Sequence, residues 1–391
     1  MKLIRFFYPI AIILFAWSVC VTMYSLILDD TTKLFGYSTE YFMVPLFLIN
    51  CVVIIDSFDS ILKRSRGLNS LVLIWLFLVL TFYVLSLHFK LREFIELSLW
   101  GTSYLASYYI IKNKPEYFLI YKWVFLIAFI LGLYYFVTGK VLQMGLSSFG
   151  MQQSSNAVFC LLTVFPFLFF FKSKPFFYSL LLVAVIAVVF SNKRSALLIL
   201  AFALLPTLWA SFSNIKTKSK RFFLIAVLGI AIGALFYYVS NEYLEGKVFS
   251  RFENLSDDQG SGRMEIWTYV INSLFNSNLF EWFIGHGHNA VSALGEATAS
   301  HNDFLDVIYD YGLFVFIVYI LIHIHIIRRT YYLYKTKNSL FGSYFFAFVV
   351  FFVMSWISIL VVQARYLIYF GIYWGAVEAL IDRKNNNNVL K

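Results

Sequence analysis

Charged residues are scarce in this sequence. They make up 13% of its 391 residues, whereas hydrophobic residues make up 61%. Soluble domains are about 25% charged and roughly 45–50% apolar. The composition therefore excludes a water-soluble fold and indicates an integral membrane protein.

Cysteine is also rare, with three residues in the whole chain. Cys20, Cys51 and Cys160 all lie inside apolar runs and show no paired spacing. Disulfide bonds and a cysteine-based zinc site are therefore not expected.

A nucleotide-binding motif is missing as well. The sequence has no G-x-x-x-x-G-K-[ST] motif, which leaves an ATP-driven machine of the P-loop type unsupported. The formal net charge of +10 could indicate a nucleic-acid partner, but the basic residues lie in the links between apolar runs. Membrane topology explains them there, because positively charged loops resist translocation. No nucleic-acid partner is expected.

Long apolar runs are what the sequence has in abundance. A helix that crosses a bilayer must span about 30 Å of hydrocarbon, and hydropathy predicts about twelve such helices. The first run lacks a small-residue cleavage site, so it is interpreted as an uncleaved membrane helix. The predicted spans are residues 6–28, 41–55, 71–88, 94–111, 117–137, 157–171, 176–190, 196–211, 222–240, 312–327, 340–361 and 366–381.

Successive links between the predicted spans lie on alternate sides of the membrane. Lysine and arginine are distributed unevenly between these two sides. The side richer in these residues is predicted to be cytoplasmic. Because the number of spans is even, both termini are then cytoplasmic. The longest link lies on the opposite, outer side.

This long link divides the chain into three parts. Residues 1–240 are predicted to form transmembrane helices 1–9 with short loops, and residues 241–311 the long outer loop. Residues 312–391 are predicted to form transmembrane helices 10–12 and a cytoplasmic tail. The loop is too short for an independent enzyme domain, so any chemistry there must rely on the membrane surface.

A helical pattern opens the second half of the loop. The spacing of Arg263, Trp267, Val270 and Leu274 predicts an amphipathic helix that lies at the membrane interface. Such a helix would hold the Arg263 guanidinium just above the lipid. An ordinary anchor whose arginine extends towards water explains the pattern equally well.

Residues Ser300 to Leu305 predict the start of another helix. Ser300 is the expected N-cap, with Asp303 three residues later. His301 would then lie in the first turn, where the positive end of the helix dipole favours a neutral imidazole that can accept a proton. A polar residue at a helix start with no chemical role is the alternative interpretation.

A glycine-rich turn and three outer cations complete the candidate features. Residues 285–289 read Gly-His-Gly-His-Asn, and two histidines without a clear carboxylate partner make a poor metal site. A turn that lines a pocket is the preferred interpretation. The positively charged residues Lys193, Arg194 and Arg365 are predicted on the outer side, where the positive-inside rule disfavours them, which indicates a function that requires cations there.

Taken in order, four motifs resemble the O-antigen ligase and O-antigen polymerase superfamily. They are the Ser-x-x-Arg-Ser turn that ends at Ser195, the Gly262-Arg263-x-x-x-Trp267 pair, the Gly285-x-Gly287 turn, and His301-Asn302-x-x-Leu305 followed by Gly312. In that family a long periplasmic loop lies between two late spans and ends in an HN-x-x-L helix. This sequence departs from the usual pattern in Asn192-Lys193 ahead of the arginine and in His288 within the glycine turn.

The resemblance implies a multi-pass protein of the bacterial inner membrane with its active loop in the periplasm. It implies a metal-independent, inverting glycosyltransferase that uses an undecaprenyl-pyrophosphate-linked oligosaccharide and needs no cofactor. Arg263 and Arg194 would bind the diphosphate, and His301 would act as general base. Alternatively, His301 would bind the pyrophosphate and no side-chain base would be needed. The residues expected to bind substrate are Asn302, Lys193, His288 and Arg365.

Three functions are compatible with this sequence. An O-antigen polymerase joining lipid-linked repeat units is favoured, with a chain-length regulator protein as a conceivable partner. An O-antigen ligase that transfers glycan to lipid A core uses the same chemistry. A polysaccharide transporter or flippase would be expected to bury ionisable groups at mid-membrane depth. Few such groups lie inside the predicted spans. The main cases, Glu96 and Lys122, lie near span ends, which disfavours this function.

Overall fold

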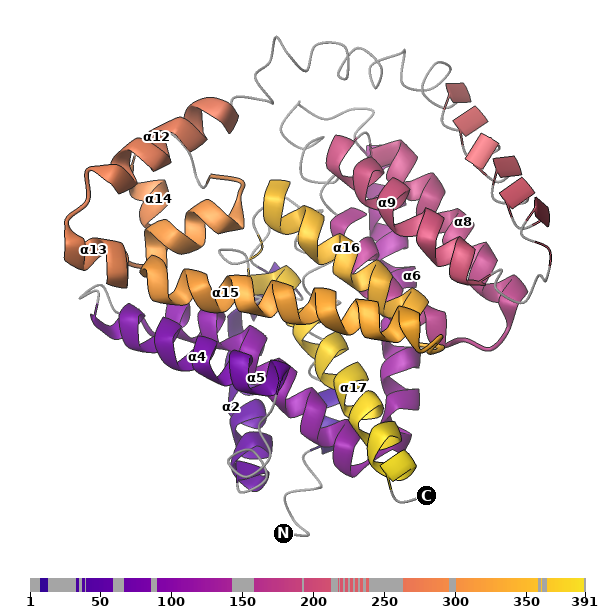
Figure 1. Cartoon of the computed structure of the whole chain (residues 1–391), viewed down its shortest axis with the longest axis horizontal. Coiled ribbons are helices and arrows are strands. Elements are labelled where there is room, and N and C mark those ends of the chain that lie inside the picture. The colour runs from indigo at the N-terminus through magenta and orange to yellow at the C-terminus, as the bar shows by residue number, and fades with distance from the viewer. Residues whose placement is uncertain are drawn as a thin grey trace.

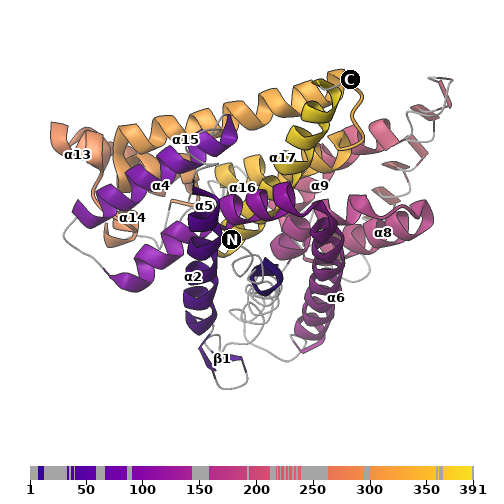
Figure 2. The same ribbon diagram turned by 90° about the horizontal axis from the view of Figure 1, so that it is seen from below.

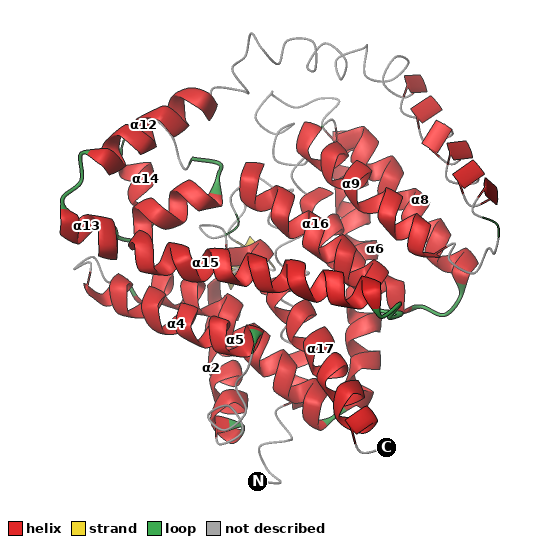
Figure 3. Cartoon of the chain, in the orientation of Figure 1, coloured by secondary structure: helices red, strands yellow, loops and turns green. Residues whose placement is uncertain are grey.

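The chain is described by a computed structural model in which almost every residue whose placement is described lies in a helix (Figure 3). Among these residues, β-structure is confined to the two-residue antiparallel strands β1 (Lys33–Leu34) and β2 (Tyr37–Ser38). The structure describes residues 8–12, 33–34, 37–38, 40–58, 67–85, 90–142, 158–191, 193–211, short pieces between 217 and 238, 263–294, 300–357, 360 and 364–389.

The long helices follow one another with few other elements between them. They are α2 (Glu40–Asp56), α4 (Leu68–Leu85), α5 (Leu91–Asn113), α6 (Phe118–Leu142), α8 (Lys174–Ser191), α9 (Arg194–Ser211), α15 (Asp303–Lys335), α16 (Phe341–Ile357) and α17 (Ala364–Val389). The shorter ones are η2 (Pro115–Tyr117), η4 (Phe165–Phe170), α12 (Arg263–Phe275), α13 (Leu279–Ile284) and α14 (Ala290–Ala293). The chain is therefore an all-α membrane protein.

Each predicted span that the structure describes coincides with a helix. Within the described residues, four helices are long and apolar enough to cross a membrane: Leu68–Leu85, Pro115–Tyr134, Lys174–Ser191 and Asp303–Lys335. Most of the predicted spans 6–28 and 222–240 lies outside the described residues. The count of twelve spans stays a prediction.

Helices α5 and α17 form the closest packed pair in the core. Gly371 and Gly375 of α17 face the backbone of α5, where a Cβ on Gly371 would lie 2.6 Å from the Trp100 carbonyl oxygen. The Ser107 hydroxyl of α5 donates a hydrogen bond of 2.8 Å to the Ile372 carbonyl of α17. Small residues at a helix interface allow this approach, as is common in membrane proteins.

Helix α15 extends across the molecule (Figure 1). Helices α12, α13 and α14 gather at its N-terminal end, while α16 and α17 lie towards its C-terminal end (Figure 1). Seen from below, α4 runs alongside α15, whereas α2 and α6 run across that direction (Figure 2).

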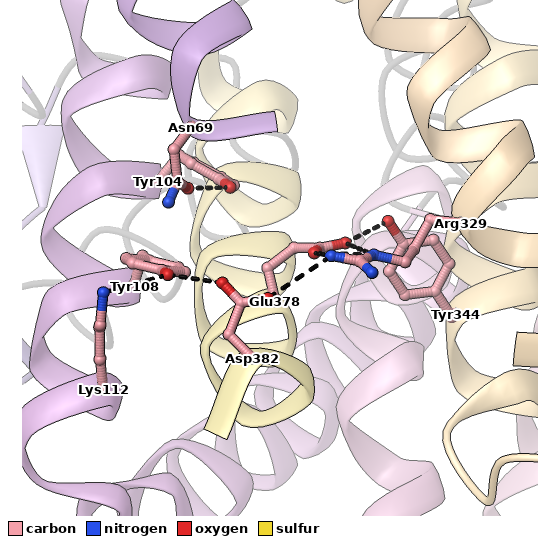
Figure 4. Close-up of polar contacts among 8 residues, drawn as sticks. All are labelled: Asn69, Tyr104, Tyr108, Lys112, Arg329, Tyr344, Glu378 and Asp382. Atoms are coloured by element: carbon pink, nitrogen blue, oxygen red, sulfur yellow. Dashed lines mark hydrogen bonds and ion pairs between the residues drawn. The ribbon is translucent and has the colours of Figure 1, made fainter. Parts of the chain in front are cut away.

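A buried polar cluster holds the C-terminal end of α15 against its neighbours (Figure 4). The Arg329 Nη2 atom lies 2.6 Å from Glu378 Oε2, and the Tyr344 hydroxyl donates to Glu378 Oε1 at 2.8 Å. The Tyr108 hydroxyl donates to Asp382 Oδ2 at 2.7 Å. This Arg329 cluster joins α5, α15, α16 and α17.

Glu378 corrects the expectation that Glu96 and Lys122 are the main ionisable groups inside the spans. It lies within predicted span 366–381 and is 3% exposed. Its partner Arg329 lies beyond residue 327, where hydropathy ends the preceding predicted span. The helix itself continues to Lys335 and so brings the guanidinium to Glu378.

Candidate active site

Asn302, and not Ser300, is the N-cap of α15. The Asn302 Oδ1 atom accepts hydrogen bonds from the backbone N–H groups of Phe304 at 3.0 Å and Leu305 at 3.4 Å. His301 therefore precedes the cap and does not lie in the first helical turn, so that prediction was wrong. The error has a physical origin, because serine and asparagine are equally good N-caps and the sequence offers both.

His301 adopts a left-handed backbone conformation, with a φ angle of 56°. Such a conformation costs of the order of 1–3 kcal/mol for a residue other than glycine and persists only where the surroundings impose it. Both backbone groups of the preceding Ser300 are held. Trp267 Nε1 donates to the Ser300 carbonyl at 2.8 Å, and the Ser300 N–H donates to Asp306 Oδ1 at 3.1 Å.

The environment of His301 favours its neutral form. Burial lowers the pKa of His301 most, and the positive charges of Arg263 and Lys193 lower it further. Arg263 is the first residue of α12 and lies one turn before Trp267. The Trp267 bond to Ser300 therefore also brings the Arg263 guanidinium towards the imidazole, and gives Trp267 a structural role besides any stacking on sugars.

Lys193 approaches His301 from another part of the chain. Arg194 is the first residue of α9, and Lys193 directly precedes it. Both side chains are partly buried, and the Lys193 N–H donates to the Ser191 hydroxyl at 3.2 Å. The structure thus brings His301, Arg263 and Lys193 together, with Arg194 adjacent to Lys193.

Three buried carboxylates on α15 were not predicted as part of the site. Asp303, Asp306 and Asp310, called here the acidic stripe, lie on neighbouring turns and are each at most 1% exposed. Asp303 Oδ1 accepts from the Leu360 N–H at 2.8 Å, and Asp310 accepts from the N–H groups of Asn289 and Val291 at 2.9 and 3.1 Å. Their i, i+3, i+7 spacing places them on one face of a helix, and this pattern in the sequence could have indicated that they belong together.

The glycine turn rests on the backbone of α15. Gly285 and Gly312 have φ angles of 85° and 75°, and a Cβ on either would collide with the backbone of the other segment. Gly312 breaks the regular helix, so preceding carbonyl groups lose their usual partners. The His286 and Gly287 N–H groups bond to the Tyr309 and Asp310 carbonyls at 3.0 and 2.9 Å.

Residues 179–320 match the family model described as O-antigen ligase. The match runs from α8 into α15 and includes Lys193, Arg194, Arg263 and His301. It confirms the predicted resemblance to the O-antigen polymerase and ligase superfamily. No curated protein matches the chain.

Within the O-antigen ligase match, His288 lies in a different environment from His301. Its Nδ1 atom lies 2.5 Å from the Tyr311 hydroxyl, and its ring meets that of Tyr83 edge to face at 6.0 Å. Burial lowers the pKa of His288, while the Glu93 carboxylate raises it and Lys90 lowers it. These charged neighbours come from the start of α5 and not from α9 or α12.

The other two residues predicted to bind substrate are Asn302 and Arg365. Asn302 is buried, and its Oδ1 atom is engaged in capping α15. Arg365 belongs to α17, but its side chain lies outside the described residues. The Leu360 bond to Asp303 nevertheless brings the segment before α17 to the start of α15.

The remaining candidate features are metal ligands and thiols. In the part of the chain that the structure describes, no group of three or more His, Cys, Asp or Glu residues could hold a metal ion. Cys51 and Cys160 are free thiols, and Cys20 lies outside the described residues.

Proposed function

We propose that this protein is an O-antigen polymerase. It would join undecaprenyl-pyrophosphate-linked oligosaccharide repeat units at the periplasmic face of the bacterial inner membrane, with both termini in the cytoplasm. The observation that supports this proposal best is the grouping of His301 with Arg263 and Lys193, whose charges lower the pKa of the imidazole.

The cations would stabilise the leaving group. Glycosyl transfer breaks the bond between the anomeric carbon and a pyrophosphate oxygen, and the lipid-linked diphosphate departs with that electron pair. A guanidinium binds two phosphate oxygens at once and stays charged at every relevant pH. Arg263 and Arg194 would take this role without a metal ion, with Lys193 adding positive charge.

His301 would act on the acceptor. A neutral imidazole can take the proton of the acceptor hydroxyl as its oxygen attacks the anomeric carbon, which inverts the configuration there. The imidazolium formed would then lie near the departing diphosphate. Arg263 and Lys193 would therefore serve both steps, because they add to the effect of burial in lowering the pKa of His301 before the reaction and attract the anion that the reaction releases.

The remaining substrate contacts would come from Asn302, Arg365 and His288. The Asn302 amide N–H₂ would be available to a sugar, since its oxygen caps the helix. Arg365 would approach through the segment held on Asp303, and His288 would contact a sugar further from the reacting bond. A chain-length regulator protein would bind elsewhere on the molecule.

A ligase is the second candidate, and the description of the matching family model favours it. The two enzymes differ in the acceptor, which is another lipid-linked repeat unit for a polymerase and lipid A core for a ligase. A transporter or flippase is a third candidate, supported by the buried Arg329 and Glu378 pair, because transporters often bury ionisable groups within the membrane.

One assay separates these functions. Purified protein is supplied with undecaprenyl-pyrophosphate oligosaccharide in the presence of EDTA, and products are separated by length. A ladder of lipid-linked glycans supports the polymerase, and a product that forms only with added lipid A core supports the ligase. Absence of any transfer in both conditions, or transfer abolished by EDTA, contradicts the proposal.

The same assay tests the residues. Arg263→Gln is compared with Arg92→Gln, which alters an arginine in an exposed pair with Glu96 at 3.2 Å. Loss of transfer with Arg263→Gln and retention with Arg92→Gln supports the site. Equal activity of the two variants contradicts it.

A further inference from the structure

Asp306 has a buried carboxylate that faces the turn carrying His301. The residue is 0% exposed, and its Oδ1 atom accepts the Ser300 N–H at 3.1 Å. Its Oδ2 atom is also buried and has no hydrogen-bond partner among the residues that the structure describes. The Ser300 hydroxyl also interacts with this carboxylate. A buried carboxylate with so few partners is costly to retain, so a role in the site is expected of it.

We propose that Asp306 is a positioning residue that fixes the backbone ahead of His301 and thereby holds the imidazole beside Arg263. This inference rests on the proposed function, in which His301 is the general base. Asp306 itself does not touch the reacting atoms and acts through the Ser300 peptide group.

The turn before α15 is held from two elements at once. Asp306 of α15 binds the Ser300 N–H, and Trp267 of α12 binds the Ser300 carbonyl. The left-handed conformation of His301 follows directly after this doubly held residue. Removing either anchor frees the turn to relax to an ordinary conformation, which would move the imidazole away from Arg263.

The rest of the acidic stripe provides an internal comparison. Asp310 uses the same chemistry, since its two carboxylate oxygens accept backbone N–H groups, but it holds the start of α14. Asp303 holds Leu360 and accepts a hydrogen bond from the Tyr319 hydroxyl at 3.1 Å. Of the three, Asp306 alone bonds to the residue that immediately precedes His301.

The charges that act on His301 make its titration a direct readout of its position. Arg263 at the start of α12 and Lys193 ahead of α9 both lower its pKa, as does burial. Asp303 and Asp306 are the carboxylates of the adjoining turns of α15. An imidazole that moves outwards loses the effect of burial and of both cations, so its pKa rises towards the ordinary value of about 6.5.

The test measures this titration by NMR on the full-length protein in lipid nanodiscs with labelled histidine. The chain has six histidines, and the His301 signal is identified by its absence in His301→Asn. Asp306→Ala is expected to raise the His301 midpoint, whereas Asp306→Asn, which retains an acceptor oxygen, is expected to leave it near the wild-type value. Asp310→Ala, the matched control, is expected to leave it unchanged.

Trp267→Phe is an independent test of the same proposal, because it does not alter the buried carboxylate. It removes the other anchor of Ser300 and is expected to raise the His301 midpoint in the same direction. An unchanged midpoint in Asp306→Ala overturns the proposal. If Asp306→Ala cannot be purified as a folded protein, an unchanged midpoint in Trp267→Phe overturns it instead.

Turnover supplies the second readout. A displacement of about 1 Å at a catalytic group can cost roughly a hundredfold in rate, so Asp306→Ala is expected to lower kcat by about that factor with little change in KM. Asp306→Asn is expected to restore most of kcat. Because the titration needs no substrate, a chain that shows the midpoint shifts but no glycosyl transfer supports the positioning role and contradicts the proposed function.

Discussion

The two ends of α15 use buried charge in different ways. At the C-terminal end, Arg329 and Glu378 bond to each other, and Tyr344 completes the arrangement. At the N-terminal end, the carboxylates of the acidic stripe bond to backbone N–H groups. There the positive charges of Arg263 and Lys193 act on His301.

This difference indicates which end carries chemistry. An ion pair whose members satisfy each other holds helices together but offers little electrostatic attraction to a ligand. At the other end, backbone N–H groups bond to the carboxylates, and Arg263 and Lys193 lie close enough to His301 to act on it electrostatically. This contrast supports the proposal that catalysis takes place at the start of α15, whereas the Arg329 cluster at its other end holds helices together.

The strongest test of this comparison is His301→Asn. Asparagine tolerates the left-handed conformation better than most residues, so the turn should persist while the base is lost. The rate of glycan transfer is expected to fall by about 10²–10⁴. The unfolding midpoint, followed by tryptophan fluorescence, is expected to stay at the wild-type value, and a variant with near-normal turnover would remove His301 from the mechanism.

At the other end of α15, Glu378→Gln should affect stability and not chemistry. It removes the carboxylate 2.6 Å from Arg329 Nη2 but leaves Asp382 at 3.6 Å, so the loss should lie near the lower end of the roughly 3–5 kcal/mol that breaking a buried pair typically costs. The free energy of unfolding in detergent is expected to fall by that amount, and KM for the lipid-linked donor is expected to stay unchanged. Replacing both residues, with Arg329→Met and Glu378→Leu, should restore most of the stability.

A substitution at the contact between the glycine turn and α15 is expected to cause a smaller loss of stability. In Gly312→Ala the new Cβ would collide with the Phe283 backbone, and the positive φ angle would strain the residue. A loss of about 2 kcal/mol in the free energy of unfolding is expected. Gly233→Ala is the matched control, because nothing lies within 4 Å of a Cβ there, and it should not destabilise the protein.

The smallest expected effect is a shift in the pH dependence of activity. Because the pKa of His301 is lowered, its neutral form persists below the ordinary histidine value of about 6.5. The acid limb of the profile of kcat/KM against pH is therefore expected below that value. Arg263→Gln removes one of the charges that lower the pKa, so in its residual activity the limb should move to higher pH; movement to lower pH would contradict the assignment.

Much of the helical fold could be predicted from hydropathy, for a physical reason. A membrane helix must satisfy its backbone hydrogen bonds internally and cover them with apolar side chains, and this requirement appears in every span. Helix α12 was equally predictable, because its buried residues Val270 and Leu274 follow the predicted stripe. Hydropathy could not predict where α15 ends, since its last turns are polar.

The candidate site was only partly predictable. The cations and His301 stand out because they are polar residues in an apolar chain. The role of Asp306 could not be predicted, because it depends on a bond to Ser300 whose geometry only the folded turn defines. His288 shows the opposite case, since it is close in sequence to the other motifs but lies beside Tyr83 and Tyr311.

The break at Gly312 sets the depth at which the protein can work. The part of α15 that follows Gly312 covers about 35 Å at 1.5 Å per residue, which alone exceeds the hydrocarbon thickness of about 30 Å. The preceding turns are then free to bend along the headgroup layer. A carrier lipid could keep its isoprenoid tail among the acyl chains while presenting its phosphates at that level, so the donor would never have to leave the bilayer.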